Sequence, residues 1–200
     1  NTDYVTYLEQ IEGLEFIDPK RKQAQKILAA WDLGTDLTNT SAAMGTCVFL
    51  AVQPNANRRE DGKAEISEIL DKCIVGLDKA VGRMDPPWGE VNRHVRGDLN
   101  LPVAGGPDIL RAIYGRGLAE DGYLTNVAGD GLYYLVEWDA TGALTVEGIH
   151  QFGSATLDET SSHYADQAED YALEILHDPW FSEAALQQNL QHSYRPGDSP

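Results

Sequence analysis

The chain has 200 residues, of which 42% are hydrophobic and 24% are charged, as is usual for a globular protein of one or two domains. Its formal net charge of −17 argues against nucleic acid and anionic membrane as partners, because both need a basic surface. No run reaches the roughly 18 apolar residues of a membrane-spanning helix. Asn1 is not an initiator methionine, so we expect the chain either to have been processed or to be part of something longer.

Helical periodicity dominates residues 1–86. Four segments show it: residues 4–12, 18–34, 42–52 and 66–81. Asp18 followed by Pro19 predicts a helix start, since Asp is a good N-cap and Pro suits the first helical position; Gly34 is the predicted end. The third segment is nearly all apolar, which predicts a helix buried on most sides. The polar stretch between the third and fourth segments, residues 53–62, is expected to be an exposed loop.

The two cysteines, Cys47 and Cys73, lie on the apolar sides of two of these predicted helices. They permit one disulfide without requiring it, because free thiols are common in protein cores. Both alternatives stay open from the sequence.

Strands are predicted in the middle of the chain. Two short candidates cover residues 99–103 and 109–114, in a region rich in glycine and proline. Aromatic and β-branched residues then fill 132–138 and 144–152, separated by Asp139-Ala140-Thr141-Gly142, which predicts a buried β-hairpin.

Helical character returns in the last part of the chain. A turn at Gly153-Ser154 and a polar loop are predicted to lead into a helix that begins near Ser162 or His163 and stops before Pro179. Ser182 can cap a last helix that extends to about His192. The tail 195–200 is expected to be disordered or loosely held on the surface.

The order of elements, helices then strands then helices, predicts an α+β protein. The strands are too few to close a sheet sandwich by themselves. We therefore expect the hairpin to complete a larger sheet that is built by chain not present here.

Several segments, taken in order, resemble the C-terminal part of the penicillin acylase family, which includes the acyl-homoserine-lactone acylases. The segments are Leu28-Ala29-Ala30-Trp31-Asp32, Pro87–His94, Gly105-Gly106-Pro107-Asp108, Glu137-Trp138-Asp139, His150–Ser154 and His163-Tyr164-Ala165-Asp166-Gln167. One departure is Ser161-Ser162-His163, where the family usually has Ser-Pro-His. The resemblance covers nearly the whole chain, although each segment alone is weakly specific.

The resemblance implies a helix-flanked part of an N-terminal-nucleophile αββα sheet sandwich, in the β-subunit of an autoproteolytic precursor. The intact enzyme would use an N-terminal Ser to hydrolyse an acyl amide such as a penicillin, an acyl-homoserine lactone or a lipopeptide side chain. Asn1 has no hydroxyl or thiol and cannot be that nucleophile. We therefore expect no catalytic, cofactor-binding or metal-binding residue on this chain, which alone would be inactive.

The same resemblance implies partners and location. The partners would be the α-subunit, the N-terminal part of the β-subunit and a small acyl amide substrate. Export of the precursor implies a periplasmic or secreted protein. Members of the family bind calcium through residues outside the matched segments, so calcium would be bound elsewhere in the intact enzyme and Asp158-Glu159 are not assigned to it.

Two dipeptides have the form of the family's autocleavage junction, Gly45-Thr46 and Gly153-Ser154. Cleavage at the second would leave too few residues for an amidase pocket. We interpret both as turns.

The histidines offer weak candidates for a site. His163 and Asp166 are three residues apart on the predicted helix and could share a metal ion or a hydrogen bond. A histidine at the helix start that hydrogen-bonds the chain is favoured, because zinc would need two more ligands and none stands out. His150 is interpreted as a core residue, and His94 as structural in preference to a pocket rim. His177 is expected near a helix C-terminus, where it would be favourable to the helix dipole.

The rival hypothesis is a non-catalytic, independently folded domain that binds a partner or ligand. One feature separates the two hypotheses. A chain that stands alone must cover its own apolar surface, so an uncovered apolar patch on the predicted hairpin would favour a part of a larger enzyme.

Overall fold

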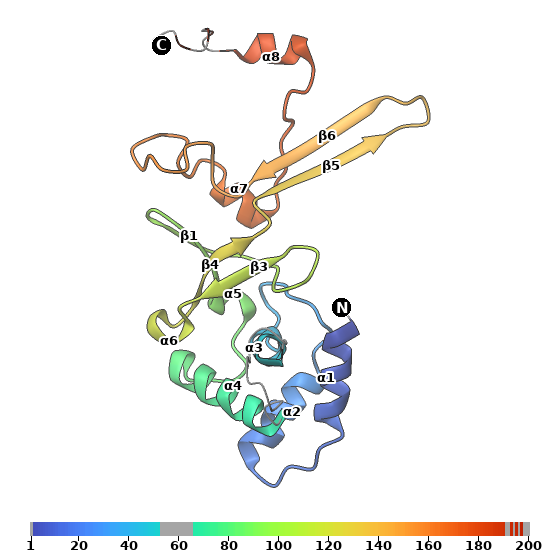
Figure 1. Cartoon of the computed structure of the whole chain (residues 1–200), viewed down its shortest axis with the longest axis vertical. Coiled ribbons are helices and arrows are strands. Elements are labelled where there is room, and N and C mark those ends of the chain that lie inside the picture. Colours follow the sequence, from blue (N-terminus) through green and yellow to red (C-terminus); the bar gives the residue numbers. More distant parts are fainter. Residues whose placement is uncertain (1, 53–65, 191–192, 194, 196, 198–200) are drawn as a thin grey trace.

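The computed structural model describes residues 2–52, 66–190, 193, 195 and 197 of the chain. It shows a mixed α+β protein in which a helical part, a central sheet and a projecting hairpin follow one another along the longest axis (Figure 1). The predicted α+β class is confirmed at this level. Asn1, the loop expected at 53–62 and most of the C-terminal tail lie outside the described residues.

Four helices form the N-terminal part, as predicted: α1 (Thr2–Glu12), α2 (Pro19–Ala29), α3 (Ala42–Val52) and α4 (Ile66–Val81). Helix α2 begins where expected, because the Asp18 carboxylate accepts a hydrogen bond from the Arg21 backbone N–H at 2.9 Å. The predicted end at Gly34 was wrong, since α2 ends at Ala29. Residues 30–34 instead form a tight connection, which is fixed by the Trp31 indole N–H donating to the Gly34 carbonyl at 2.8 Å.

The four helices share one apolar core, and α3 is buried along most of its length, as predicted. Trp31 packs directly on Gly45, where an added Cβ atom would lie 2.2 Å from the indole ring. Tyr4 stacks on Phe49 with ring centroids 3.7 Å apart, which brings α1 onto α3. Aromatic packing thus holds both the connection after α2 and helix α1 against α3.

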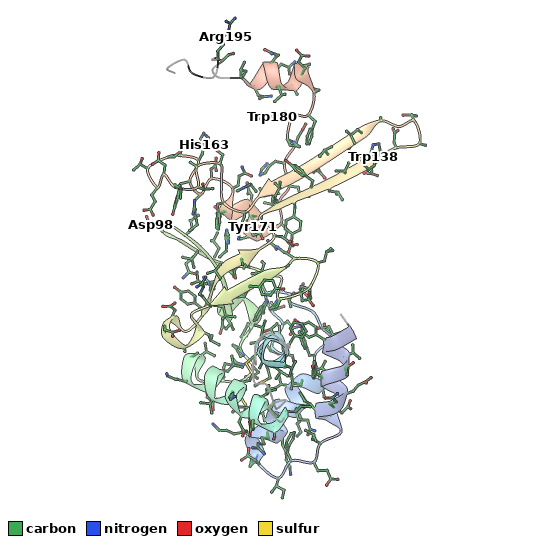
Figure 2. The ribbon with its side chains drawn as sticks, viewed as in Figure 1. Asp98, Trp138, His163, Tyr171, Trp180 and Arg195 are labelled. Carbon is green, nitrogen blue, oxygen red and sulfur yellow. A yellow bond between two sulfur atoms is a disulfide. The ribbon has the colours of Figure 1, made fainter. Side chains whose placement is uncertain are left out.

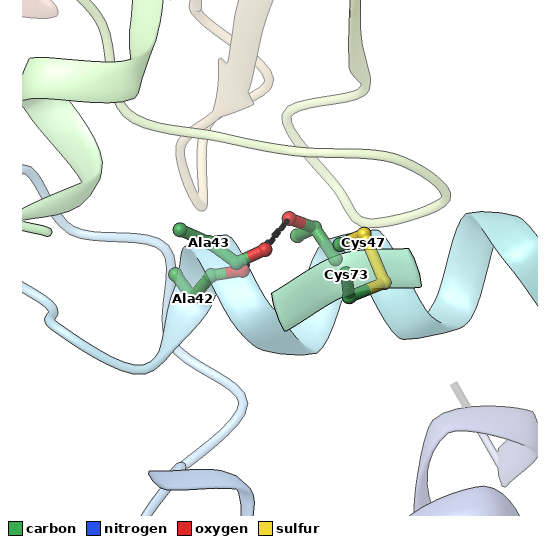
Figure 3. Close-up of a disulfide and its surroundings, with 5 residues drawn as sticks. Ala42, Ala43, Cys47 and Cys73 are labelled. Atoms are coloured by element: carbon green, nitrogen blue, oxygen red, sulfur yellow. Dashed lines mark hydrogen bonds between the residues drawn. A yellow bond between two sulfur atoms is a disulfide. The ribbon is translucent and has the colours of Figure 1, made fainter. Parts of the chain in front are cut away.

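A disulfide joins α3 to α4 through Cys47 and Cys73, so the disulfide alternative is the one that the structure contains (Figure 3). The two Cα atoms are 5.8 Å apart and 26 positions separate the residues in sequence. Cys73 is 1% exposed and belongs to the helical core, whereas Cys47 is half-buried, so the bond lies at the edge of that core.

The central sheet has four strands in the order β2-β1-β4-β3. The strands are β1 (Asn92–Arg96), β2 (Leu99–Pro102), β3 (Ile113–Arg116) and β4 (Leu124–Gly129). Strands β1 and β4 are parallel, whereas β1–β2 and β3–β4 are antiparallel. Short helices α5 (Trp88–Val91) and α6 (Leu118–Asp121) precede β1 and β4, and α6 contacts α4.

The sequence predicted only part of this sheet. The strand expected at 99–103 is confirmed as β2, but the strand expected at 109–114 begins later, as β3. Strands β1 and β4 were not predicted, because their polar residues do not alternate with apolar ones.

The predicted hairpin is confirmed as β5 (Leu132–Trp138) and β6 (Leu144–His150), paired from Leu132–His150 to Trp138–Leu144. Its turn forms because the Asp139 carboxylate accepts from the backbone N–H groups of Thr141 and Ala143, at 2.8 and 2.9 Å. Gly142 supplies the left-handed conformation that the turn needs, with a φ of +83°.

The described residues do not bury this hairpin. It projects away from the sheet, and Trp138 lies near its far end (Figures 1 and 2). Among the described residues only its base is covered, where Ile149 packs with Val103, Ile113 and Tyr171 in a second, smaller core.

The helix predicted from Ser162 or His163 begins later, as α7 (Ala168–Leu173). Turns precede it because polar side chains bind the backbone locally: Asp158 accepts from the Thr160 N–H at 3.0 Å, and the Ser161 hydroxyl accepts from the His163 N–H at 3.1 Å. Glu174 then adopts a left-handed conformation, with φ of +62°, and ends the helix.

The last helix, α8 (Glu183–Asn189), is capped as predicted, because the Ser182 hydroxyl accepts from the Ala185 N–H at 3.1 Å. Within the part of the chain that the structure describes, no helix is both long and apolar enough to span a bilayer.

Candidate functional site

Two of the segments that carry the family resemblance, Pro87–His94 and Gly105-Gly106-Pro107-Asp108, meet in a buried network beside β1. The Trp88 indole N–H donates to the Gly105 carbonyl at 2.7 Å. The Asn92 amide donates to the carbonyls of Val103 and Gly105, at 2.9 and 3.3 Å. Trp88 and Asn92 are each 1% exposed, so these bonds satisfy polar groups that water cannot reach.

Gly105 is required at the centre of this network. Its φ is +102°, and an added Cβ would lie 2.6 Å from the Arg111 carbonyl oxygen. The Tyr4 hydroxyl donates to the nearby Pro107 carbonyl at 2.9 Å, which ties α1 to the same loop. These matched segments therefore have an evident structural role.

The downstream matched segments form a second contact, centred on Arg96. Its guanidinium lies between the rings of Phe152 and Tyr164, with Cζ 4.5 and 3.6 Å from the centroids. It also donates to the carbonyls of Tyr164 and Thr156, at 3.1 and 2.9 Å. Arg96 therefore fastens the loop 152–167 onto the β1–β2 hairpin.

Two buried polar side chains, His94 and Asn126, lie side by side on β1 and β4. The parallel register pairs Arg93 with Thr125, so the next residues share the opposite face. His94 Nε2 lies 2.9 Å from the Gln151 carbonyl, whereas its Nδ1 and both amide atoms of Asn126 have no hydrogen-bond partner among the described residues. Burial lowers the pKa of His94 and keeps the ring neutral.

An apolar cleft of about 470 Å³ opens between α7 and the base of the β5–β6 hairpin. Its walls are mainly aromatic and aliphatic: Leu110, Tyr133, Leu135, Ile149, Tyr171 and Leu176, with Arg111 at one side. Tyr171 lies between the central sheet and the hairpin (Figure 2). This volume falls in the range of small-molecule sites.

Polar groups at the cleft are already bonded to one another. The Asp130 carboxylate accepts from the Tyr133 hydroxyl at 2.9 Å and from the Ala112 N–H at 2.8 Å. The Arg111 guanidinium pairs with Glu174 at 2.5 Å and also donates to the Tyr171 carbonyl.

The two phenols at the cleft are held in the protonated form. Burial, then the contact with Asp130, raises the pKa of Tyr133, and burial raises that of Tyr171. Both phenols therefore stay protonated at neutral pH, and each donates its O–H to Asp130. None of the described residues that line the cleft is a Ser, Thr, Cys or His.

A second, polar hollow of about 340 Å³ lies between the β1–β2 turn and the loop before α7. Asp98, Glu159 and Asp166 contribute carboxylates to it. His163 Nδ1 lies 2.7 Å from Asp166 Oδ2, so the two share a hydrogen bond, but His163 lies on a turn and not at the start of a helix as predicted. Among the described residues, no group of three or more His, Cys, Asp or Glu side chains is placed to hold a metal ion.

The other predicted histidines have structural partners. His94 is fully buried, in agreement with the structural interpretation. His150 is half-buried, and its Nδ1 accepts from the Phe152 N–H at 3.3 Å. His177 was wrongly placed near a helix C-terminus: it lies beyond α7, pairs through its backbone with Gly148, and its Nε2 is 2.9 Å from Asp170.

The remaining candidates are also accounted for locally. Asp158 accepts from the Thr160 hydroxyl, which lowers the pKa of its carboxyl. Gly153-Ser154 lies in a loop, as predicted. The turn interpretation of Gly45-Thr46 was wrong, because both residues lie inside α3.

Three polar residues were not predicted from the sequence: Arg111 and Asp130 at the cleft, and the buried Asn126. Asp130 had a usable signal, because it stands between two glycines directly before an aromatic strand. Arg111 and Asn126 lie in polar segments that carry no periodic pattern.

No protein-family model matches the sequence, and a search of curated proteins finds no match.

Proposed function

We propose that this chain is the C-terminal portion of the β-subunit of a penicillin-acylase-like amidase. The observation that carries the proposal, together with the ordered set of matched segments, is the uncovered apolar surface of the β5–β6 hairpin. A free-standing domain would cover such a surface with its own elements.

One face of the hairpin is apolar from its base to its far end. The exposed fractions on β5 are 49% for Leu132, 51% for Tyr134, 39% for Val136 and 66% for Trp138, and Leu144 on β6 is 53% exposed. The alternation of strand side chains puts all five on the same face. Contiguous exposed patches of this kind are rare on monomers and mark interaction sites.

In the proposed enzyme, the hairpin adds strands to an αββα sandwich that is built mainly by the rest of the precursor. An N-terminal Ser on that other sequence attacks the acyl amide, the amine leaves, and water then releases the acid from the acyl-enzyme. The residues of this chain hold the sheet and its covering helices in place. The disulfide between Cys47 and Cys73 fits export to the periplasm or outside the cell.

The alternative is a non-catalytic folded domain that binds a partner or ligand, and the apolar cleft of about 470 Å³ favours it. The two proposals differ in whether the rest of an amidase precursor accompanies the chain.

Intact-mass spectrometry of the native protein under denaturing conditions, with amidase assays in parallel, tests the proposal. We expect a second polypeptide that begins with Ser, and hydrolysis of an acyl amide. A single species of 22.0 kDa that folds cooperatively and hydrolyses nothing would refute the enzyme and leave the ligand-binding domain.

A further inference from the structure

The outer edge of β5 presents unpaired backbone groups. The bonds of the hairpin fall on odd-numbered residues, as shown by the flanking bonds from Gln151 N–H to the Gly131 carbonyl and from Asp139 N–H to the Ala143 carbonyl. In an antiparallel pair the residues between these have N–H and C=O groups directed outward. On β5 the outward residues are Leu132, Tyr134, Val136 and Trp138.

The opposite edge of the hairpin differs from this one. On β6, the outward groups of Gly148 are paired with His177, through two backbone hydrogen bonds of 2.8 Å. The outward groups of β5 have no partner among the described residues. Strand β5 also lacks Pro, Lys and Arg, which commonly protect exposed edges, so it is a ready template for another strand.

The charge of this part of the chain indicates which side chains a strand paired with β5 would carry. Residues 117–190 contain 14 of the 32 acidic residues and none of the 15 Lys and Arg. Glu137 and Glu147 lie diagonally across the hairpin, on the face opposite to the apolar one. Neither forms an ion pair within the described part of the chain.

The same charge argues against a second copy of this chain as the occupant. Pairing of β5 with its own copy would bring together two segments that each lack Lys and Arg. Like charges across neighbouring strands are destabilising, whereas opposite charges are stabilising.

We propose that a strand from the remainder of the precursor pairs along the outer edge of β5, with apolar side chains on the Trp138 face and Lys or Arg on the Glu137 face. This inference rests on the proposed function and identifies the chemistry of the partner. Main-chain bonds supply the pairing, and the alternating side chains supply the specificity.

Hydrogen–deuterium exchange on the native, assembled protein tests the pairing. The odd-numbered amides of Leu135 and Glu137 are protected by β6 in every case, so they are an internal reference. We expect the exchange rates of the Tyr134 and Val136 amides to lie within about tenfold of the rates of these reference amides. Exchange about 100-fold faster, in a protein that has its second chain and hydrolyses amides, would overturn the added strand and leave the proposed function standing.

Two proline variants of the full precursor distinguish pairing at the outer edge of β5 from pairing at the outer edge of β6. Val136→Pro removes an N–H at the outer edge of β5, whereas Val146→Pro removes an N–H at the outer edge of β6, directly opposite in the hairpin. We expect the first to lower the yield of assembled, active protein about tenfold relative to the second. Equal yields would overturn the proposal, whereas absence of amidase activity in the unmodified precursor would refute the proposed function itself.

A charge reversal tests the basic side of the strand. Glu137→Lys should lower the yield of assembled protein more than Glu137→Gln, because the lysine would face another cation. A lysine variant that assembles as well as, or better than, the glutamine variant would overturn the assignment of Lys or Arg to the partner.

Discussion

Removing the disulfide by Cys47→Ala and Cys73→Ala should strongly destabilise the helical part of the chain. The bond closes a loop of 26 positions. The chain-entropy relation for such a loop gives a stabilisation of about 3.5 kcal/mol at 25 °C, which arises mainly from restriction of the unfolded chain. That is a large share of the 5–15 kcal/mol typical of a whole domain.

Urea unfolding of the oxidised and reduced protein, and of the double variant, measures this contribution. With a slope of about 2–3 kcal/mol per molar urea, the midpoint should fall by about 1–2 M on reduction. The double variant should match the reduced protein and be insensitive to reductant. Coincident oxidised and reduced curves, or two titratable thiols in the unfolded oxidised protein, would refute the reasoning.

Three further predictions concern single side chains. Gly45→Ala should lower the free energy of unfolding by about 1–3 kcal/mol, because the added Cβ would clash with Trp31. Gly76→Ala, in open space on α4, should be neutral or stabilising in the same urea-unfolding assay. Because the pKa of His94 is lowered by burial, the unfolded chain binds its proton first. The contribution of His94 to stability is therefore fully present above about pH 6.5 and is lost below it, by up to about 1.4 kcal/mol per pH unit. His94→Gln should flatten that part of a measured profile of unfolding free energy against pH. Arg96→Lys should cost about 1–3 kcal/mol of unfolding free energy, because an ammonium cannot reproduce the stacking and the two carbonyl bonds; an unchanged melting temperature would contradict this role.

Elements fixed by local chemistry were predictable from the sequence. The start of α2 follows from Asp18 and Pro19, and the β5–β6 turn follows from Asp139 and Gly142, because in each case a side chain or a backbone preference acts within four residues. Helix α4 was equally predictable, because its long apolar pattern repeats with the period of a helix and depends on no distant contact.

Elements fixed by distant contacts were not predictable. Strand β1 contains Asn92, His94 and Arg96, and its polar side chains are explained only by partners elsewhere in the chain. The late start of α7 has the same origin: the loop before it is held by Arg96, and an added Cβ at Gly153 would lie 2.2 Å from the His163 carbonyl oxygen. The cleft could not be found because Arg111 and Asp130 come together with Tyr171 only through the fold.

The two cores differ in what they can hold in place. Among the described residues, the helical core contains 18 buried apolar residues and adjoins a disulfide, whereas the core at the hairpin base has four, Val103, Ile113, Ile149 and Tyr171. Polar contacts such as the hydroxyl of Tyr171 on the Asp130 carbonyl, at 3.0 Å, fix the base of the hairpin but do not reach its far half. An aromatic strand that extends beyond so small a core gains little from its own chain, because burial of apolar area supplies most of the stability of a strand. The far half of β5 therefore makes physical sense as an interface, as the proposed pairing with a further strand requires.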